Sequence, residues 1–100
     1  MKKIKLLIPI FNDWESLNKL LENINFNLPK LNFNISLIVV NDASNEKNKN
    51  NLNKFENIHS KKIINLIKNI GHARSIATGL KYIFEKEEFD YIIPMDGDGE

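Results

Sequence analysis

The sequence has no cysteine, and it also lacks any segment that would place it in or across a membrane. Without cysteine, neither a disulfide framework nor a thiolate metal site can form, which fits a reducing compartment. No apolar stretch approaches the roughly 20 residues that a helix needs to cross a bilayer. The N-terminal MKKIKLLIPIF begins like a signal peptide, but its short apolar run is interrupted by Lys5 and Pro9. We therefore expect a cytoplasmic chain without a transmembrane segment.

An excess of charge of one sign is also missing. The 14 lysines and arginines and 13 aspartates and glutamates give a formal net charge of +1. This balance provides no basic field, so nucleic acid is not an expected partner. Two familiar nucleotide motifs are absent as well, the G-x-G-x-x-G fingerprint and the G-x-x-x-x-G-K-[ST] phosphate loop.

The apolar residues that are present alternate between short continuous runs and longer stretches of helical period, which indicates βαβ units. Four runs are predicted to be strands: 4–10, 35–40, 61–67 and 90–95. Parallel neighbours need long, right-handed connections. We therefore expect a doubly wound, mainly parallel α/β sheet of Rossmann-like type, in a single domain that spans residues 1–100.

Two of the connections are predicted to be strong helices. The first begins near Asn12, which can cap it, with Glu15 in capping-box spacing. The second covers residues 69–88, and Gly79 within it costs about 1 kcal/mol against alanine, which indicates close packing. Its predicted inner stripe consists of Ala73, Ile76, Ala77, Leu80 and Phe84. The asparagine-rich connection 45–60 is expected to hold only a short or frayed helix.

Each predicted strand ends on polar side chains. In open α/β sheets, ligands bind beyond the carboxyl ends of the strands. The charged and titratable residues at these ends are Asp13, Asp42, His72, Arg74, Asp96, Asp98 and Glu100. Turn chemistry alone explains some of them, because Asn, Asp and Gly are common in βα loops. Four such ends on one edge nevertheless predict a ligand site.

The stretch DGDGE, residues 96–100, places three carboxylates at alternate positions, on one side of an extended segment. Oxygen ligands of this kind suit Mg²⁺ or Mn²⁺. An EF-hand is rejected because the fifth position is Glu100 and the preceding segment is a predicted strand. Two alternatives stay open: a solvated turn, and a phosphotransferase of the haloacid dehalogenase type with Asp96 as its nucleophile.

Four segments carry a resemblance to a known family: IPIFND, VVNDAS, NIGHARSIATGL and MDGDGE. Their order and intervals resemble the nucleotide-binding half of a family 2 glycosyltransferase with the GT-A fold, and the resemblance covers nearly the whole chain. The nearest subgroup is similar to dolichol-phosphate mannosyltransferases and polyprenyl-phosphate sugar transferases. The resemblance implies metal-assisted sugar transfer from a nucleotide-diphosphate sugar to an acceptor such as a polyprenyl phosphate or a glycan. A polyprenyl acceptor implies work at the cytoplasmic face of a membrane.

The resemblance also implies roles for individual residues. Those implied to contact the nucleotide are Pro9, Phe11, Asp13, Asp42, Asn69, Gly71, Arg74 and Asp96. Among them, Asp42 matches an aspartate that hydrogen-bonds the base. Asp96 and Asp98 match the family's D-x-D, and Glu100 stands where the subgroup often has a further ligand. These three are the implied ligands of Mg²⁺ or Mn²⁺.

The second half of the family pattern is expected to lie beyond Glu100. The general base and the acceptor site belong to that half, so we expect a truncated chain whose catalytic base is unknown. A non-catalytic nucleotide-binding module therefore stays an alternative. One local departure is Pro94, which lies inside the fourth predicted strand and cannot donate a ladder hydrogen bond. It predicts an irregularity or an unpaired side just before the DGDGE stretch.

Overall fold

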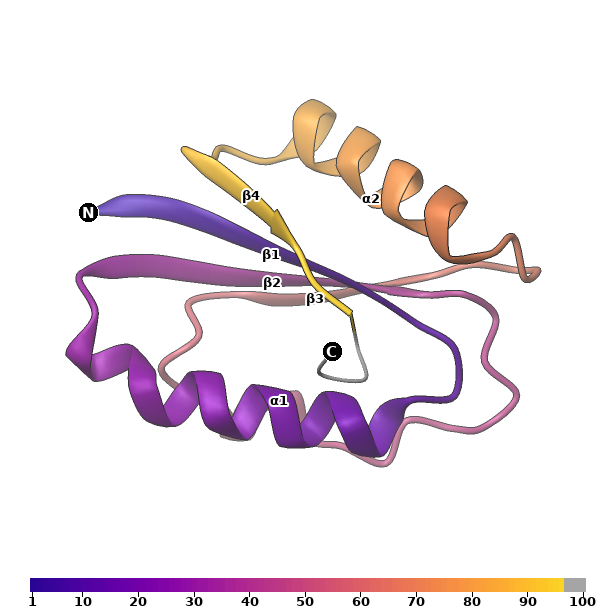
Figure 1. Cartoon of the computed structure of the whole chain (residues 1–100), viewed down its shortest axis with the longest axis horizontal. Helices are drawn as coiled ribbons and strands as arrows, with labels where there is room; N and C mark the ends of the chain where they lie inside the picture. Colours follow the sequence, from indigo (N-terminus) through magenta and orange to yellow (C-terminus); the bar gives the residue numbers. More distant parts are fainter. Residues whose placement is uncertain (97–100) are drawn as a thin grey trace.

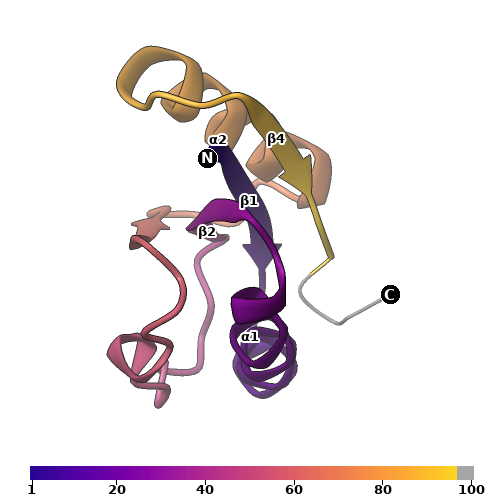
Figure 2. The same cartoon turned by 90° about the vertical axis from the view of Figure 1, so that its left-hand side faces the viewer.

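The computed structural model describes residues 1–96 and consists of a parallel sheet with one α-helix on each face (Figure 1). Its strands are β1 (Lys2–Ile10), β2 (Phe33–Asn41), β3 (Lys61–Asn65) and β4 (Tyr91–Pro94), in the order β3-β2-β1-β4. Helix α1 (Trp14–Asn27) covers one face and α2 (His72–Lys86) the other, as the turned view shows (Figure 2). The predicted doubly wound α/β sheet is confirmed. Within residues 1–96, no helix has the length and apolar character needed to span a membrane.

Strands β1 and β2 form the centre of the sheet because their apolar side chains are covered on both faces. On one face, Leu6 of β1 packs with Leu17 and Leu21 of α1. On the other, Leu7 packs with Ile83 of α2. Alternate residues of a strand point to opposite faces, so one continuous apolar run supplies both layers. Burying each such side chain contributes about 1.5–3 kcal/mol to stability.

The inner stripe of α2 differs from the prediction. Three residues expected to be buried are exposed, namely Ala73, Ala77 and Phe84. The buried residues are instead Ser75, Gly79 and Ile83, spaced by four along the helix. A methyl group at Gly79 would overlap the side chain of Leu7, and it would lie 3.1 Å from Val40 Cγ2. The close packing predicted from Gly79 is thus confirmed, because a side chain at this position of α2 would meet Leu7 of β1 and Val40 of β2.

Helix α1 begins after the residue that was expected to cap it. Its N-cap is Asp13, whose side chain makes no capping hydrogen bond. Asn12 adopts a left-handed conformation, with φ 63°, and its Oδ1 accepts a hydrogen bond from Glu46 N at 3.0 Å. Asparagine tolerates this conformation better than most residues. The predicted cap at Asn12 is wrong because its amide makes a long-range contact to the β2–β3 connection.

The asparagine-rich connection between β2 and β3 contains one short 3-10 helix, η2 (Leu52–Lys54), and a similar one, η1 (Leu28–Lys30), follows α1. Phe55 and Ile58 anchor the connection on the α1 face of the sheet, where both are buried. The short helix predicted here is confirmed. Strand β3 ends at Asn65, before the predicted end, and leaves the side chain of Ile67 fully exposed.

Strand β4 is an edge of the sheet as far as residues 1–96 describe it, because it pairs with β1 alone. Pro94 lies at its end, opposite Leu7. A proline is tolerated where the outer side of the strand has no ladder partner. The unpaired side predicted from Pro94 is therefore confirmed.

Candidate functional site

The strand-end loops that were predicted to form a site lie together at the carboxyl edge of the sheet. All four strands are parallel, so their carboxyl ends meet at this edge, where both α-helices begin (Figure 1). The chain runs from β1 through β2 to β3 on one side of β1 and then returns to β4 on the other side. A crevice for ligands opens at such a switch point in open α/β sheets.

Asp42 is the buried carboxylate of this edge, and its side chain fastens the loop that precedes α2. The residue follows β2 directly and is 4% exposed. Its Oδ1 accepts a hydrogen bond from Ile70 N at 2.7 Å, and its Oδ2 accepts from Gly71 N at 2.9 Å and Asn69 Nδ2 at 3.0 Å. Charge-assisted bonds of this kind are stronger than neutral ones. No lysine or arginine of residues 1–96 pairs with this carboxylate.

Gly71 allows this loop to enter α2. It is the N-cap of the helix and has φ 92° and ψ 164°. Residues with a Cβ rarely adopt this combination, because it crowds the side chain against the backbone. The glycine predicted beside a nucleotide therefore has a local structural role: it turns the chain so that its own N–H points at Asp42.

A hollow of about 110 Å³ opens beside Asp42, and we call it the strand-end hollow. Its lining residues are Pro9, Ile10, Phe11, Asp13, Asp42, His72 and Ser75. Four of the predicted nucleotide contacts thus share one hollow, while Asn69 and Gly71 bond to Asp42 behind it. Sites for drug-sized ligands are usually larger, about 300–1,000 Å³. This hollow therefore has room for one ring-sized group of a larger ligand.

Two polar residues of the strand-end hollow had no individual role predicted, Ser75 and His72, although His72 was among the titratable residues expected at the strand ends. Ser75 is fully buried, and its Oγ has no hydrogen-bond partner among the described residues. Its spacing of four from Gly79 was the available sequence signal, because both are small residues of one helical face. His72 Nε2 lies 3.3 Å from Asp96 Oδ1, which joins the start of α2 to the end of β4. Nothing in the sequence indicates that pair, because the two residues are far apart along the chain.

Of the other predicted site residues, the structure describes Arg74 and Asp96. Arg74 is exposed in the first turn of α2 and does not line the strand-end hollow. Asp96 lines a neighbouring hollow of about 230 Å³ between α2 and β4. Asp98 and Glu100 lie outside the described residues. Up to residue 96, no three His, Cys, Asp or Glu side chains gather as a metal cluster. The predicted metal ligands therefore stay a prediction.

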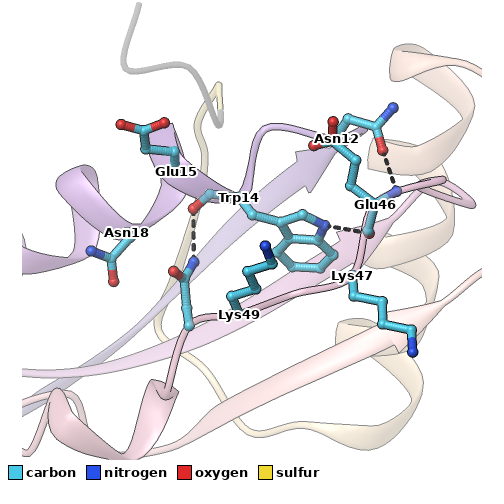
Figure 3. Close-up of a pocket in the computed structure, with 8 residues that line it drawn as sticks. Asn12, Trp14, Glu15, Asn18, Glu46, Lys47 and Lys49 are labelled. Carbon is cyan, nitrogen blue, oxygen red and sulfur yellow. Dashed lines mark hydrogen bonds between the residues drawn. The ribbon is translucent and has the colours of Figure 1, made fainter.

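A larger hollow, of about 610 Å³, lies beside the first turn of α1 (Figure 3). Trp14 Nε1 donates a hydrogen bond to the backbone oxygen of Glu46 at 2.9 Å, which ties the β2–β3 connection to the helix. Figure 3 shows Lys49 beside the indole, whereas Glu15 and Lys47 extend away from it. Charges of both signs line this hollow, and its contacts hold a loop in place. The strand-end hollow is therefore the better candidate for a ligand site.

The chain matches known proteins along almost its whole length. The model of the family described as glycosyl transferase family 2 matches residues 6–100. A curated relative is the undecaprenyl-phosphate 4-deoxy-4-formamido-L-arabinose transferase of Proteus mirabilis (strain HI4320). The two sequences are 30% identical over an alignment of 100 positions, which covers 98% of this chain and 29% of that protein.

Solved structures share the fold. S. aureus TarS 1-349 superimposes with a TM-score of 0.73 at 22% identity, over 96% of this chain and 27% of that one. Its complex with UDP-GlcNAc gives the same TM-score at 21% identity, over 96% of this chain and 26% of that one. The chain thus spans less than a third of the length of the relatives it matches. Because the family model covers all but the first few residues, the chain belongs to glycosyl transferase family 2.

Proposed function

We propose that this chain carries the donor site of a glycosyltransferase that transfers a sugar from a nucleotide-diphosphate sugar to an acceptor. The observation that carries the proposal is the strand-end hollow with buried Asp42, at the switch point of a family 2 domain. The UDP-GlcNAc complex of TarS supports a donor of the nucleotide-sugar class. The name of the Proteus relative supports a polyprenyl phosphate as acceptor, although a glycan is the other predicted class. A polyprenyl acceptor would place the reaction at the cytoplasmic face of a membrane.

The strand-end hollow would take the base of the donor. Phe11 is 42% exposed at its mouth, and an exposed aromatic ring offers a surface on which a base can stack. The diphosphate would then lie along the first turn of α2. The N-terminus of a helix favours negative charge, and the exposed guanidinium of Arg74 starts from the same turn. Departure of the nucleoside diphosphate develops negative charge, which a cation at this position stabilises.

The carboxylates of the DGDGE stretch are chemically suitable ligands for a divalent cation. Asp96 presents a half-exposed carboxylate at the end of β4, in contact with His72. The other two predicted ligands, Asp98 and Glu100, follow it in the sequence outside the described residues. Mg²⁺ and Mn²⁺ prefer such oxygen ligands and keep positions free for phosphate oxygens. When bound, the ion would neutralise charge on the leaving diphosphate.

Calorimetry with UDP-GlcNAc, GDP-mannose and dTDP-glucose in the presence of Mn²⁺ tests the donor site. We expect at least one of them to bind to the folded chain. Binding should weaken when Mn²⁺ is chelated and in the Asp98→Ala variant, but not in Glu85→Gln, which removes an exposed carboxylate from the other end of α2. A folded sample that binds none of the three would overturn the proposal.

Sugar transfer itself separates an enzyme from a module that only binds. To test the acceptor class, a nucleotide sugar with a radiolabelled sugar is incubated with undecaprenyl phosphate, and the label on the lipid is measured. Transfer of label to the lipid supports the proposal and rules out a purely binding module. Binding of a donor without transfer to either a lipid or a glycan acceptor would favour the module.

A further inference from the structure

We propose that His72 is a positioning residue: its imidazole orients the carboxylate of Asp96 for a divalent cation, and it thereby couples binding of the cation to binding of the nucleotide. The inference rests on the proposed function, because it concerns the cation and the nucleotide of the same site. It is drawn from the contact between His72 Nε2 and Asp96 Oδ1, at 3.3 Å, and from the way in which each residue is held.

Asp96 lies just beyond the last backbone bond that ties β4 to the sheet. Met95 N donates to Leu7 O at 2.9 Å, immediately before Asp96. The carboxylate of Asp96 is 48% exposed, and within residues 1–96 it forms no ion pair other than the contact with His72. Fixing an exposed side chain in one rotamer costs free energy when it binds a ligand. A neighbour that orients the carboxylate beforehand reduces this cost.

The backbone of His72 is fixed to the buried part of the carboxyl edge. His72 is the first residue of α2 and follows the N-cap, Gly71. Gly71 N donates to Asp42 Oδ2 at 2.9 Å, and Gly71 O accepts from Ser75 N at 3.0 Å. The imidazole therefore extends from a firmly bonded turn, whereas the carboxylate that it contacts follows the last bonded residue of β4.

His72 also joins two hollows. It lines the strand-end hollow, whereas Asp96 lines the neighbouring hollow between α2 and β4. Both side chains are about half-exposed, so ligands have access to them. A nucleotide in the first hollow and a cation on Asp96 would each restrict one member of the same pair. When one ligand has ordered the pair, the second ligand pays less to bind, which is positive coupling.

The chemistry of the imidazole suits an orienting role. A neutral imidazole can donate one N–H, so the contact does not require a charged histidine. Donation to Oδ1 leaves Oδ2 free to ligate a cation. Carboxylate ligands are commonly held by such outer hydrogen bonds, and these bonds often tighten when the ligand binds. Direct ligation by His72 is less suitable, because Mg²⁺ and Mn²⁺ prefer oxygen ligands.

Calorimetric titration of the folded chain with UDP, in the presence and absence of Mn²⁺, tests the coupling. GDP replaces UDP if the wild type does not bind UDP. The ratio of the two affinities measures the coupling, and comparing variants cancels the Mn²⁺ complex that the nucleotide forms in solution. We expect a ratio about tenfold smaller in His72→Ala, the low end of the effect of losing such a bond. Affinity without Mn²⁺ should change by no more than about threefold, because the cation is then absent.

The outcomes separate this inference from the proposed function. If the wild type binds neither nucleotide, both fall. If it binds one of them but Mn²⁺ does not strengthen binding, or if His72→Ala keeps the wild-type ratio, the inference falls and the donor site stands. Electron paramagnetic resonance of free Mn²⁺, recorded with saturating nucleotide, should show the same loss of Mn²⁺ affinity in His72→Ala, because coupling is reciprocal.

His72→Gln separates an orienting N–H from a metal-ligating imidazole. Glutamine places an amide N–H near the position of Nε2, so we expect the ratio to return to within about threefold of the wild type. His59→Gln is the matched control: it changes the other histidine of the chain, which is exposed at the amino-terminal ends of the strands, and the ratio should stay the same. A glutamine variant as weak as His72→Ala would overturn the orienting role.

A double-mutant cycle with Asp96→Ala shows whether His72 acts through that carboxylate. In the Asp96→Ala chain, the further change His72→Ala should alter the ratio by less than about twofold. The same tenfold loss in both backgrounds would mean that His72 acts independently of Asp96, which would overturn the inference. All variants should melt within about 2–4 °C of the wild type, since an exposed contact contributes little to stability.

Discussion

Charged side chains lie at both ends of the parallel strands, which we call the amino edge and the carboxyl edge of the sheet. At the amino edge they form ion pairs with one another, whereas the buried carboxylate of the carboxyl edge forms none within residues 1–96. At the amino edge, Lys5 and Lys62 contact the carboxylate of Glu87 at 3.3 and 2.9 Å. The hydrogen bond from Lys62 and then that from Lys5 lower the pKa of Glu87, against the effect of burial. At the carboxyl edge, the carboxylate of Asp42 accepts hydrogen bonds from N–H groups and pairs with no lysine or arginine of residues 1–96.

The contrast gives a criterion besides charge and cavity size for choosing between the two hollows as a candidate ligand site. The amino edge holds the larger hollow, of about 250 Å³ against about 110 Å³ at the strand ends. Both of its glutamates pair with lysines that also line it, Lys3 and Lys5, so a ligand that binds these side chains would have to break existing ion pairs. At the carboxyl edge, the buried Ser75 Oγ has no hydrogen-bond partner among residues 1–96, and Asp42 is in no ion pair there. Unused hydrogen-bonding capacity is therefore the feature that separates the two edges.

The largest expected effect is that of Asp42→Ala. It removes three hydrogen bonds and leaves the N–H groups of Ile70 and Gly71 without their partner. We expect the free energy of unfolding to fall by about 3 kcal/mol or more, since each bond to a charged group contributes about 1.5–3 kcal/mol. Urea denaturation measures it. Asp13→Ala, at an exposed position of the same edge, should change stability by no more than about 0.5 kcal/mol. Similar losses in both variants would contradict the structural role of Asp42.

The next largest effect on stability is expected at Gly71, where the chain turns from the loop bound by Asp42 into α2. Gly71→Ala should cost about 1–3 kcal/mol, because the conformation with φ 92° and ψ 164° is strained for any residue with a Cβ. A steric contact does not contribute, since the added methyl group would meet no atom of residues 1–96 within 4 Å. Thermal melting followed by circular dichroism reports the loss. If Gly71→Ala melts like the wild type, the loop does not hold this conformation in solution.

At the amino edge, Glu87→Gln should lower the free energy of unfolding by about 1 kcal/mol at neutral pH, a value reduced by partial solvent screening. The pKa of Glu87 is lowered in the folded chain, so its contribution is present above the ordinary value of 4.5 and is lost as the pH falls through the folded pKa. The difference between wild type and variant should therefore shrink on acidification. Urea titrations across that range measure it.

Glu88→Gln is the matched control for that variant. Glu88 pairs with Lys3, but both side chains are largely exposed, at 87% and 48%. Exposed ion pairs contribute little to stability. The two variants should therefore differ at neutral pH, and a Glu88 effect as large as that of Glu87 would mean that burial does not distinguish the pairs.

Most of the fold could be predicted because it follows from patterns local in the sequence. Continuous apolar runs gave the central strands, and their polar ends gave the carboxyl edge with Asp42. The inner stripe of α2 could not be predicted from hydrophobicity. Ala73, Ala77 and Phe84 suggested one face, but the helix presents Gly79 to the sheet. At that position even the methyl group of an alanine would overlap the side chain of Leu7.

The contacts that build the candidate site could not be predicted, for a different reason. Asp42 binds a loop far along the chain, and His72 meets Asp96 at the end of another strand. Such pairs depend on the three-dimensional path of the backbone, which no spacing rule encodes. The same limitation explains the wrong prediction at Asn12. Local spacing indicated a helix cap, but its side chain accepts a long-range hydrogen bond from Glu46 N.

The smallest effect on stability is expected from His72→Ala. This variant also tests most directly whether the charged contacts of the carboxyl edge serve ligand binding rather than folding. The side chains of His72 and Asp96 are 58% and 48% exposed, so their contact contributes little and stability should change by no more than about 0.5 kcal/mol. UDP affinity in Mn²⁺ should fall, however, because the variant removes a wall of the strand-end hollow and the partner of Asp96. His59→Ala, at the exposed amino edge, should change neither the melting curve nor the calorimetric titration. A His72→Ala chain that loses stability but keeps its affinity would show that the carboxyl edge, like the amino edge, uses its charged contacts for folding.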